Sequence, residues 1–309
     1  MKTIRIKAPA TSANFVCGFD IIGFAVESPG DEVELRFNAA KTIRITEITG
    51  SDSLSSNANE NCAAYVLQLF CQKINTRQGL DIRLHKGVPI GSGLGSSAAG
   101  SMGVLYAANI LFDSPLTDME LVSLAMQGEA FISGALHADN VAPCLLGGIT
   151  LIPVQDPLQI ISCPVPPDLG FVIALPDFEL PTKEARKVLP ETIALKTAVK
   201  QWGNVAGLVA SLFRKDTEQL AMFLRDHIIE PARAALIPGF YQVQRAALEA
   251  GAFSCSISGG GPSLVAMTRH PSASGEIADA MKNAFTGAGL SCRCYVTRIS
   301  KKGCERVDT

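Results

Sequence analysis

Residues 87–101, GVPIGSGLGSSAAGS, decide how the chain can be interpreted, because they join a glycine-rich loop to a helix-forming run at 98–112. Three alternating glycines, Gly91, Gly93 and Gly95, allow the backbone to take positive φ angles and to approach a ligand closely. A helix that begins directly after such a loop directs free N–H groups and the positive end of its dipole at one point. The pattern predicts an anion site, for which a phosphate is the most suitable ligand.

This loop belongs to neither of two common phosphate-binding types. No lysine follows the last glycine as in GxxxxGK[ST], and the glycines alternate where a dinucleotide fingerprint reads GxGxxG. Taken alone, the stretch is also compatible with a flexible turn between a strand and a helix. The order PIGSGLGSSAA, however, resembles the phosphate-binding motif of the GHMP kinases, a family of small-molecule kinases. The resemblance implies an ATP site formed by Asn61, Pro89, Ile90, Gly91, Ser92, Gly93, Leu94, Gly95, Ser96, Ser97 and Ala98. Asn61 is equally suited to cap the helix predicted at 62–75.

Composition and charge exclude several classes of function. The chain has 309 residues, 47% of them hydrophobic, which is enough for two domains with substantial cores. A formal net charge of −2 gives no electrostatic reason to expect a nucleic acid or an anionic membrane as a partner. The most apolar window, 141–154, is too short to span a bilayer, and the first residues lack the apolar centre of a signal peptide. Nine scattered cysteines without CxxC spacing indicate neither a disulfide framework nor a zinc site. We therefore expect a cytoplasmic protein.

The N-terminal segment 7–23, KAPATSANFVCGFDIIG, contains two candidate binding residues, Asn14 and Asp20. Taken alone, these residues are as well explained as turn formers, because their side chains readily hydrogen-bond their own backbone. The segment is also similar to the opening segment of the homoserine kinases, a branch of the GHMP kinases, in which these two positions bind the amino-acid substrate. The chain has Phe-Val-Cys at 15–17 where the branch usually has Leu-Gly-Pro, so a different local turn is expected.

A second helix is predicted to begin at Asp118, because Thr117 and Glu120 form a capping box. Glu129 lies in this helix within the apolar run AMQGEAFISGA. A buried carboxylate is unfavourable unless it is paired or bound to a metal. The spacing alone also allows Glu129 to lie on the polar side of the helix. The resemblance to the GHMP kinases implies that Glu129 holds Mg²⁺ together with Ser97, with Ser96 as the next candidate.

Residues 137–143, HADNVAP, are close to a signature of the homoserine kinases. Asn140 stands where other GHMP kinases often have an aspartate that acts as a general base. An asparagine cannot take a proton at neutral pH. The resemblance therefore implies that the substrate hydroxyl attacks without a strong protein base, and His137 is expected to orient rather than to accept a proton.

Two arginines are candidates for binding a substrate carboxylate. Thr182 and Arg186 are four residues apart and share one face of a predicted helix, and Arg233 lies in the first turn of a helix begun by Pro231. Most surface arginines are merely solvated, but the planar guanidinium binds a carboxylate with two hydrogen bonds. In the homoserine kinases, two arginines in these contexts hold the carboxylate of the substrate.

Three motifs, at 7–23, 87–101 and 257–263, follow one another in the GHMP order, and the resemblance spans essentially the whole chain. The last motif contains SGGGPS and resembles a GHMP loop that closes on substrate and phosphates, although a plain hairpin turn also explains it. The resemblance implies an α+β fold of two domains, 1–155 and 165–309, divided at a proline-rich stretch. The first would be similar to the second domain of ribosomal protein S5. The second would be ferredoxin-like, in agreement with its predicted β–α–β–β–α–β order.

The implied activity is the phosphorylation of L-homoserine by ATP with Mg²⁺, on the route to threonine. The implied substrate-binding residues are Asn14, Asp20, His137, Asn140, Thr182, Arg186, Arg233 and Gly260. The implied catalytic residues are Ser97, Glu129 and Asn140. The resemblance to the family also implies a homodimer.

Two alternatives remain. Another GHMP kinase activity is disfavoured by the paired arginines and Asn140, and an inactive ligand-binding protein is disfavoured by the intact loop and Glu129.

Overall fold

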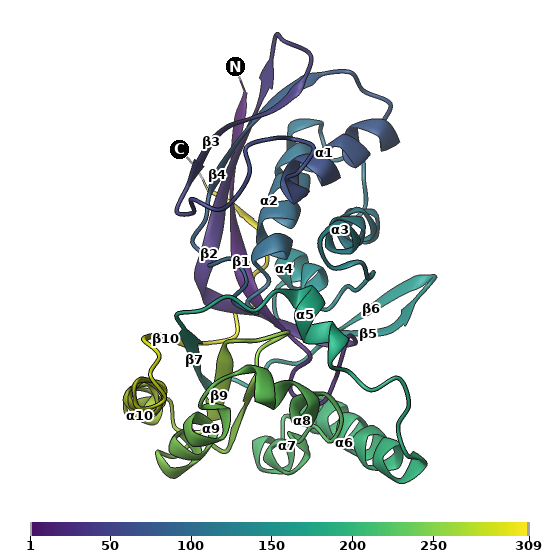
Figure 1. Ribbon diagram of the computed structural model, residues 1–309. Helices are drawn as coiled ribbons and strands as arrows, with labels where there is room; N and C mark the ends of the chain where they lie inside the picture. Colours follow the sequence, from purple (N-terminus) through teal and green to yellow (C-terminus); the bar gives the residue numbers. More distant parts are fainter. Residues whose placement is uncertain (1, 308–309) are drawn as a thin grey trace.

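The computed structural model describes residues 2–307 and consists of two β-sheets with helices packed on each (Figure 1). In the described residues the larger sheet has seven strands in the order β11-β1-β2-β4-β3, and β5 pairs with β2 and β6. The strands β3 and β4 are parallel. Their bounds are β1 (Thr3–Ala13), β2 (Ile22–Asn38), β3 (Ile43–Thr49), β4 (Gly79–His85), β5 (Ile149–Gln155), β6 (Leu158–Cys163) and β11 (Glu305–Arg306).

Four helices lie on one side of the larger sheet (Figure 1): α1 (Cys62–Lys73), α2 (Ser96–Leu111), α3 (Asp118–Ser133) and α4 (Val141–Leu146). The helix α2 contacts β1, β2, α1 and α3, and twelve of its sixteen residues are buried. Its sequence is rich in alanine, glycine and serine, so the helix can lie close to the sheet. A Cβ atom at Gly103 would come within 2.7 Å of Val33 on β2. The small residues after the glycine loop therefore place the start of α2 firmly on the sheet.

The smaller sheet contains β7 (Gly170–Pro176), β8 (Ser254–Ile257), β9 (Leu264–Thr268) and β10 (Cys292–Thr297). Its strands are antiparallel in the order β10-β7-β9-β8, which is the arrangement of a ferredoxin-like domain. The helices that follow its strands are α5 (Thr182–Lys187), α6 (Leu195–Arg214), α7 (Thr217–Phe223), α8 (Ile229–Arg233), α9 (Phe240–Glu249) and α10 (Ser274–Gly287), with short 3₁₀ turns at Ala234–Leu236 and Pro271–Ala273. No helix within residues 2–307 has the length and hydrophobicity needed to cross a membrane.

Two elements differ from the sequence-based expectation. The alternation of side chains at 2–7 predicts a strand that ends in a turn-rich stretch, but β1 continues to Ala13, and residues 8–13 are all buried. These small residues form a strand because the sheet and helices cover them, and the register shifts between Pro9 and Thr11. The apolar residues at 145–154 predict a strand, which is present as β5 but begins only at Ile149, because residues 141–146 form α4. Pro143 is tolerated there because it lies in the first helical turn, where N–H groups have no intrahelical partner.

The chain crosses between the two sheets twice. The strand β6 lies in the proline-rich stretch expected to divide the domains, yet it pairs with β5 in the larger sheet. The strand β11 also returns to the larger sheet and pairs with β1. The proposed division into 1–155 and 165–309 therefore leaves β6 outside both parts and assigns β11 to the second part, although both strands pair within the larger sheet.

Candidate active site

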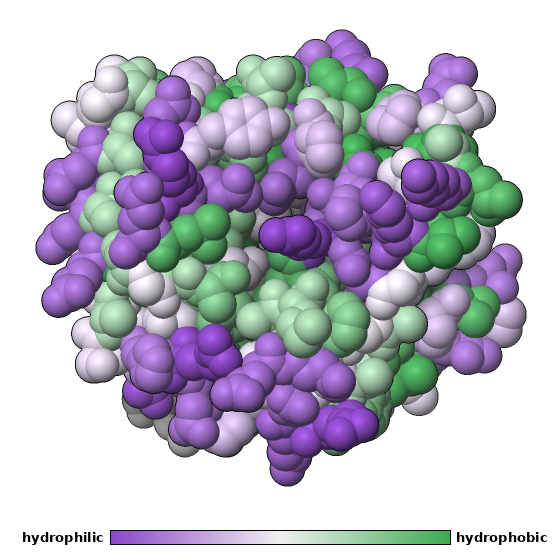
Figure 2. Space-filling model, turned by 90° about the horizontal axis from the view of Figure 1, so that it is seen from below, coloured by the Kyte–Doolittle hydropathy of each residue, from purple (hydrophilic) through white to green (hydrophobic). Residues whose placement is uncertain are grey.

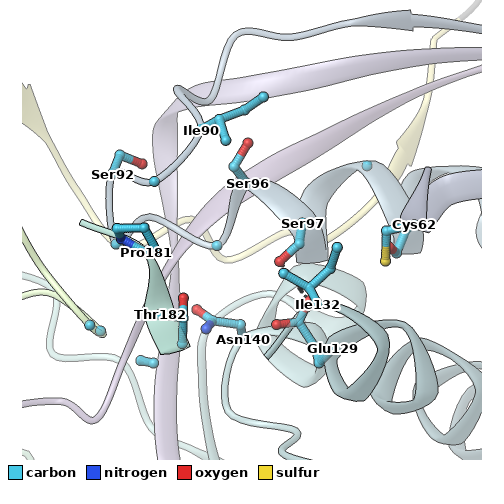
Figure 3. A pocket seen from close by; sticks show the side chains of 18 of the residues that line it. Cys62, Ile90, Ser92, Ser96, Ser97, Glu129, Ile132, Asn140, Pro181 and Thr182 are labelled. Atoms are coloured by element: carbon cyan, nitrogen blue, oxygen red, sulfur yellow. Dashed lines mark hydrogen bonds between the residues drawn. The ribbon is translucent and has the colours of Figure 1, made fainter. Parts of the chain in front are cut away.

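A cleft of about 310 Å³ lies where the glycine loop meets elements of the smaller sheet. Figure 3 shows Ser96 and Ser97 at the start of α2, with Glu129 from α3 and Thr182 from α5. The cleft is lined by these expected site residues: Asn14, Asp20, Asn61, Ile90, Gly91, Ser92, Gly93, Gly95, Ser96, Ser97, Glu129, His137, Asn140, Thr182, Arg186, Arg233 and Gly260. Three expected nucleotide residues are not in this lining. Leu94 and Ala98 are buried in the core, and Pro89 lines a neighbouring hollow.

The glycine loop depends on backbone conformations that favour glycine. Gly91, Gly93 and Gly95 all have φ between 65° and 77°. A Cβ atom at Gly93 would overlap the carbonyl oxygen of Ser258 and lie 2.7 Å from that of Gly261. The glycine alternation therefore serves two purposes. It shapes the loop at the start of α2, and it allows the turn between β8 and β9 to pack directly on it.

Hydrogen bonds hold the loop from both sides of the cleft. Thr11 N–H of β1 donates to the carbonyl of Leu94 at 3.1 Å. The Ser258 hydroxyl donates to the carbonyl of Gly93 at 2.9 Å. The first N–H groups of an α-helix have no intrahelical partner, and Ser96 and Ser97 at the start of α2 line the cleft, as an anion site requires.

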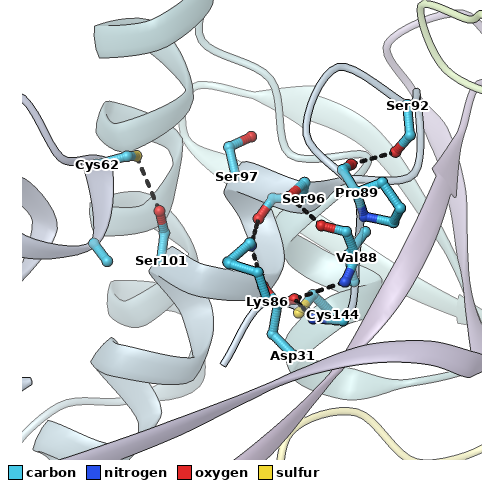
Figure 4. A network of polar contacts seen from close by, with 12 residues as sticks. Asp31, Cys62, Lys86, Val88, Pro89, Ser92, Ser96, Ser97, Ser101 and Cys144 are labelled. Carbon is cyan, nitrogen blue, oxygen red and sulfur yellow. Dashed lines mark hydrogen bonds and ion pairs between the residues drawn. The ribbon is translucent and has the colours of Figure 1, made fainter. Parts of the chain in front are cut away.

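A buried ion pair lies beneath the loop and was not anticipated from the sequence. Lys86 Nζ pairs with Asp31 and donates to the carbonyl of Ser96 at 2.8 Å. The other carboxylate oxygen of Asp31 accepts the N–H groups of Gly87 and Val88 at 3.0 and 2.9 Å. Burial raises the pKa of Asp31, although the charge of Lys86 opposes the shift. Figure 4 shows this network joining the strand before the loop to the first turn of α2.

A second polar cluster is formed by Ser97, Glu129 and His137. The Ser97 hydroxyl donates to Glu129 Oε1 at 2.7 Å, and Glu129 Oε2 lies 3.9 Å from His137 Nε2. His137 Nδ1 lies 3.1 Å from Asp139 Oδ1. Burial raises the pKa of Glu129, against the charge of His137 and the hydrogen bond from Ser97. Burial lowers the pKa of His137, but the hydrogen bond and charges of the two carboxylates outweigh it, and the net pKa is raised. Glu129 is thus a buried, partnered carboxylate directed at the cleft.

A third cluster contains one carboxylate and the two candidate arginines. Arg186 donates two hydrogen bonds to Asp20, at 3.1 and 2.7 Å. Arg233 is buried and donates to the carbonyls of Ala185 and Gly259, both at 2.9 Å. Burial lowers the pKa of Arg233 to about 10, and the charge of Arg186 adds to this effect. Arg233 is the last residue of α8 rather than a first-turn residue, because that helix begins at Ile229, two residues before Pro231.

Two asparagines hold the loops around this third cluster. Asn14 Nδ2 donates to the carbonyl of Gly259 at 2.9 Å, and its Oδ1 accepts the N–H of Asp20 at 3.2 Å. Asn140 Oδ1 accepts the hydroxyl of Thr11 at 2.8 Å. Gly259 therefore receives bonds from both Asn14 and Arg233, which connects the N-terminal segment with the turn between β8 and β9. Asn61 caps α1 by accepting the N–H of Ala63, so its capping role is confirmed, and it also lines the cleft.

Known proteins resemble this chain over nearly its whole length. The family model for the GHMP kinases N terminal domain matches residues 61–148, and the GHMP kinases C terminal model matches 208–287. A curated homoserine kinase from Chlorobium phaeobacteroides is 42% identical over a 318-residue alignment that covers 99% of each chain. The chain belongs to the GHMP kinase family. A solved structure is similar to this GHMP kinase over nearly its whole length. The crystal structure of homoserine kinase from Cytophaga hutchinsonii is 45% identical, with a TM-score of 0.95 over 99% of this chain and 98% of that one.

A more distant structure shares the fold alone. A crystal structure of mevalonate kinase is 15% identical, with a TM-score of 0.70 over 96% of this chain and 99% of that chain. The α+β fold expected for a GHMP kinase is confirmed. In this GHMP kinase, sequence reasoning missed Lys86 and Asp31. The signal in the sequence was the lysine directly before the glycine loop. A buried lysine is unusual and requires a carboxylate partner, so Lys86 indicates an ion pair at this position.

Proposed function

We propose that the chain transfers the γ-phosphoryl group of ATP to the hydroxyl of L-homoserine, giving O-phospho-L-homoserine on the route to threonine. The observation that carries this proposal is that one cleft contains both a phosphate loop and a cluster of Asp20, Arg186 and Arg233. A carboxylate beside two guanidinium groups suits a ligand with one ammonium and one carboxylate group. Full-length similarity to curated homoserine kinases supports the same substrate.

The glycine loop and the start of α2 would bind the triphosphate. The N–H groups of residues 91–97 and the helix dipole offer positive potential, and the usual P-loop lysine is missing. Phosphoryl transfer depends mainly on positioning and charge neutralisation, so a preformed loop of this kind provides what the reaction needs. Asn61 and Ile90 lie further along the cleft and would contact the nucleoside.

We propose Ser97 and Glu129 as the protein ligands of Mg²⁺. Within residues 2–307 no group of three or more histidine, cysteine or acidic side chains is arranged for a metal. Mg²⁺ in kinases usually takes only one or two side chains in addition to substrate phosphates. The two oxygens are 2.7 Å apart, and adjacent ligands of an octahedral Mg²⁺ lie about 3 Å apart. The residues present therefore fit the ion, which when bound would neutralise charge on the phosphates.

The substrate would lie between the two polar clusters. Arg186 and Arg233 would hold its carboxylate, and Asp20 would accept its ammonium group. Asn140 would orient the hydroxyl, since its amide binds the hydroxyl without removing its proton. His137, Thr182 and Gly260 complete the pocket wall. Asp20 and Arg186 bind each other, so a bound amino acid would exchange this one ion pair for two ion pairs with its own charged groups.

We also propose a cytoplasmic homodimer. The support is family habit together with an apolar stripe on α6, where Leu195, Val199 and Trp202 are 71%, 54% and 61% exposed. Figure 2 shows hydrophobic surface on the right-hand side of the view, the side on which Figure 1 places α6. Exposed apolar side chains at helical spacing are typical of surfaces that associate. Light scattering of the purified protein would measure the molar mass directly, and a monomer would contradict the proposal.

The decisive experiment is an assay of ADP release with Mg·ATP and homoserine, serine, threonine, mevalonate or galactose. We expect turnover with homoserine. Turnover with mevalonate or galactose alone would point to another GHMP kinase activity, and ATP binding without turnover would point to an inactive relative. Arg186→Ala and Arg233→Ala should raise the KM for homoserine, whereas Arg245→Ala should not, because Arg245 is 74% exposed on α9. If both cleft variants kept the wild-type KM, the carboxylate assignment would be wrong.

A further inference from the structure

Phe19 lies in the cleft lining close to both candidate arginines, and none of the roles above uses it. The guanidinium carbon of Arg186 is 5.4 Å from the centroid of its ring, and that of Arg233 is 5.3 Å away. Both distances fall within the range of cation–π attraction. The ring is partly exposed, so it forms part of the surface that a ligand would meet.

Two guanidinium groups that approach one ring repel each other. Burial and the charge of Arg186 lower the pKa of Arg233, although the charges of Asp20, Asp226 and Asp139 oppose the shift. Asp20 accepts two hydrogen bonds from Arg186, whereas Arg233 donates to two backbone carbonyls. An additional acidic side chain would neutralise the pair, but it would also occupy the N–H groups that a ligand carboxylate needs. An aromatic face attracts both cations and accepts none of their in-plane hydrogen bonds.

We infer that Phe19 is a positioning residue that holds Arg186 and Arg233 together without itself occupying any of their N–H groups, so that the carboxylate of the substrate competes with no further acceptor. This inference rests on the proposed function, because it assigns the two arginines to the substrate. The ring acts through the arginines and touches no reacting atom. Phe19 therefore determines how well an α-carboxylate is bound, and it does not take part in phosphoryl transfer.

The test compares Phe19→Leu with Phe19→Tyr. Leucine keeps an apolar side chain without a π face, whereas tyrosine keeps the ring. One cation–π contact at a partly exposed site corresponds to about a threefold to fivefold effect on binding, so loss of two should raise the KM for homoserine about tenfold or more. We expect kcat and the KM for ATP to stay within about twofold of wild type. Phe19→Tyr should restore most of the affinity for homoserine.

A substrate analogue separates positioning from general damage. Decarboxylated homoserine, 3-aminopropan-1-ol, has the hydroxyl and the ammonium but nothing for the arginines to bind. Its KM should be nearly the same for wild type and Phe19→Leu. Tyr241→Leu serves as the matched control, because Tyr241 contacts another aromatic ring but lies outside the cleft lining. The inference fails if Phe19→Leu leaves the KM for homoserine unchanged, or if it raises the KM values for both substrates equally.

A measurement without turnover keeps this inference distinct from the proposed function. Ring currents from Phe19 should shift the side-chain NMR signals of Arg186 and Arg233, and these shifts should disappear in Phe19→Leu and persist in Phe19→Tyr. Wild-type protein that turns over no homoserine would refute the proposed function whatever the spectra show. Spectra in which neither arginine responds to the substitution would refute the placement of the ring between them, even in an active enzyme.

Discussion

The buried pair of Lys86 and Asp31 allows a quantitative prediction. Their side chains are only 4% and 1% exposed, so removal of one partner leaves the other buried without its charge complement. Such a loss typically costs about 3–5 kcal/mol of unfolding free energy. We expect Lys86→Met and Asp31→Asn each to destabilise the protein by about this amount. In Lys86→Met the effect should lie near the lower value, since Asp31 already has a raised pKa and can take a proton.

The double variant decides whether the pair acts as a unit. With both charges removed, no charge of the pair is left buried without its partner, and the amide oxygen of the introduced asparagine would still accept the N–H groups of Gly87 and Val88. We therefore expect the double variant to lose only about 1–3 kcal/mol, far less than the sum of the single losses. Urea unfolding followed by circular dichroism and by the fluorescence of Trp202 measures these values, provided that the two transitions coincide. Additive single effects, or single losses below about 1 kcal/mol, would refute the reasoning.

Three further results are expected. Glu129→Gln should reduce activity at least about a hundredfold and weaken the dependence of activity on Mg²⁺. The control Glu249→Gln, at an exposed position, should change neither. If the Mg²⁺ titration of Glu129→Gln matched that of wild type, Glu129 would be excluded as a ligand. Gly93→Ala should lower kcat/KM and reduce the free energy of unfolding by about 1–3 kcal/mol, because the φ of 77° at Gly93 and the carbonyl of Ser258 both oppose a Cβ atom. A melting temperature equal to that of wild type would contradict this prediction. In the capping box of α3, hydrogen bonds from Thr117 lower the pKa of Glu120 from 4.5 to about 2, so the stabilisation by Glu120 is present above pH 4.5 and is lost as the pH falls towards 2. The variant Glu120→Gln should therefore have a lower melting temperature than wild type at neutral pH and the same melting temperature near pH 2. A difference in melting temperature that does not change with pH would rule this out.

Strong local signals made much of the fold predictable. The β–α–β–β–α–β order predicted for the second domain rests on strand patterns at 253–258 and 263–268 and a helix pattern at 274–286. These are confirmed as β8, β9 and α10 within a residue or two. The capping box at Thr117 is also confirmed. The end of β1 was not predictable, because alanine and proline, which are depleted in strands, make up four of residues 8–13, and burial by the rest of the fold decides their conformation. The two residues of β11 carry no periodic pattern at all.

The site was predictable where its chemistry lies in a contiguous motif. The glycine alternation indicated an anion site, and the structure shows the conformations that require it. Contacts between residues far apart in the sequence were not accessible. Lys86 and Asp31 are 55 residues apart, and Asp20 and Arg186 are 166 apart. No local pattern specifies such pairs, because they follow from the way the sheets and loops are brought together.

The pairing of β11 with β1 determines when the larger sheet can be completed during synthesis. Ile6 and Lys7 lie opposite Arg306 and Glu305, so one edge of β1 gains its partner only after residue 306 has been translated. Until then that edge presents unpaired N–H and C=O groups, which readily recruit strands from other chains. A nascent chain can therefore finish its smaller sheet while the larger one is still open at its edge. That edge of β1 therefore stays open to strands of other chains until residue 306 is available to pair with it.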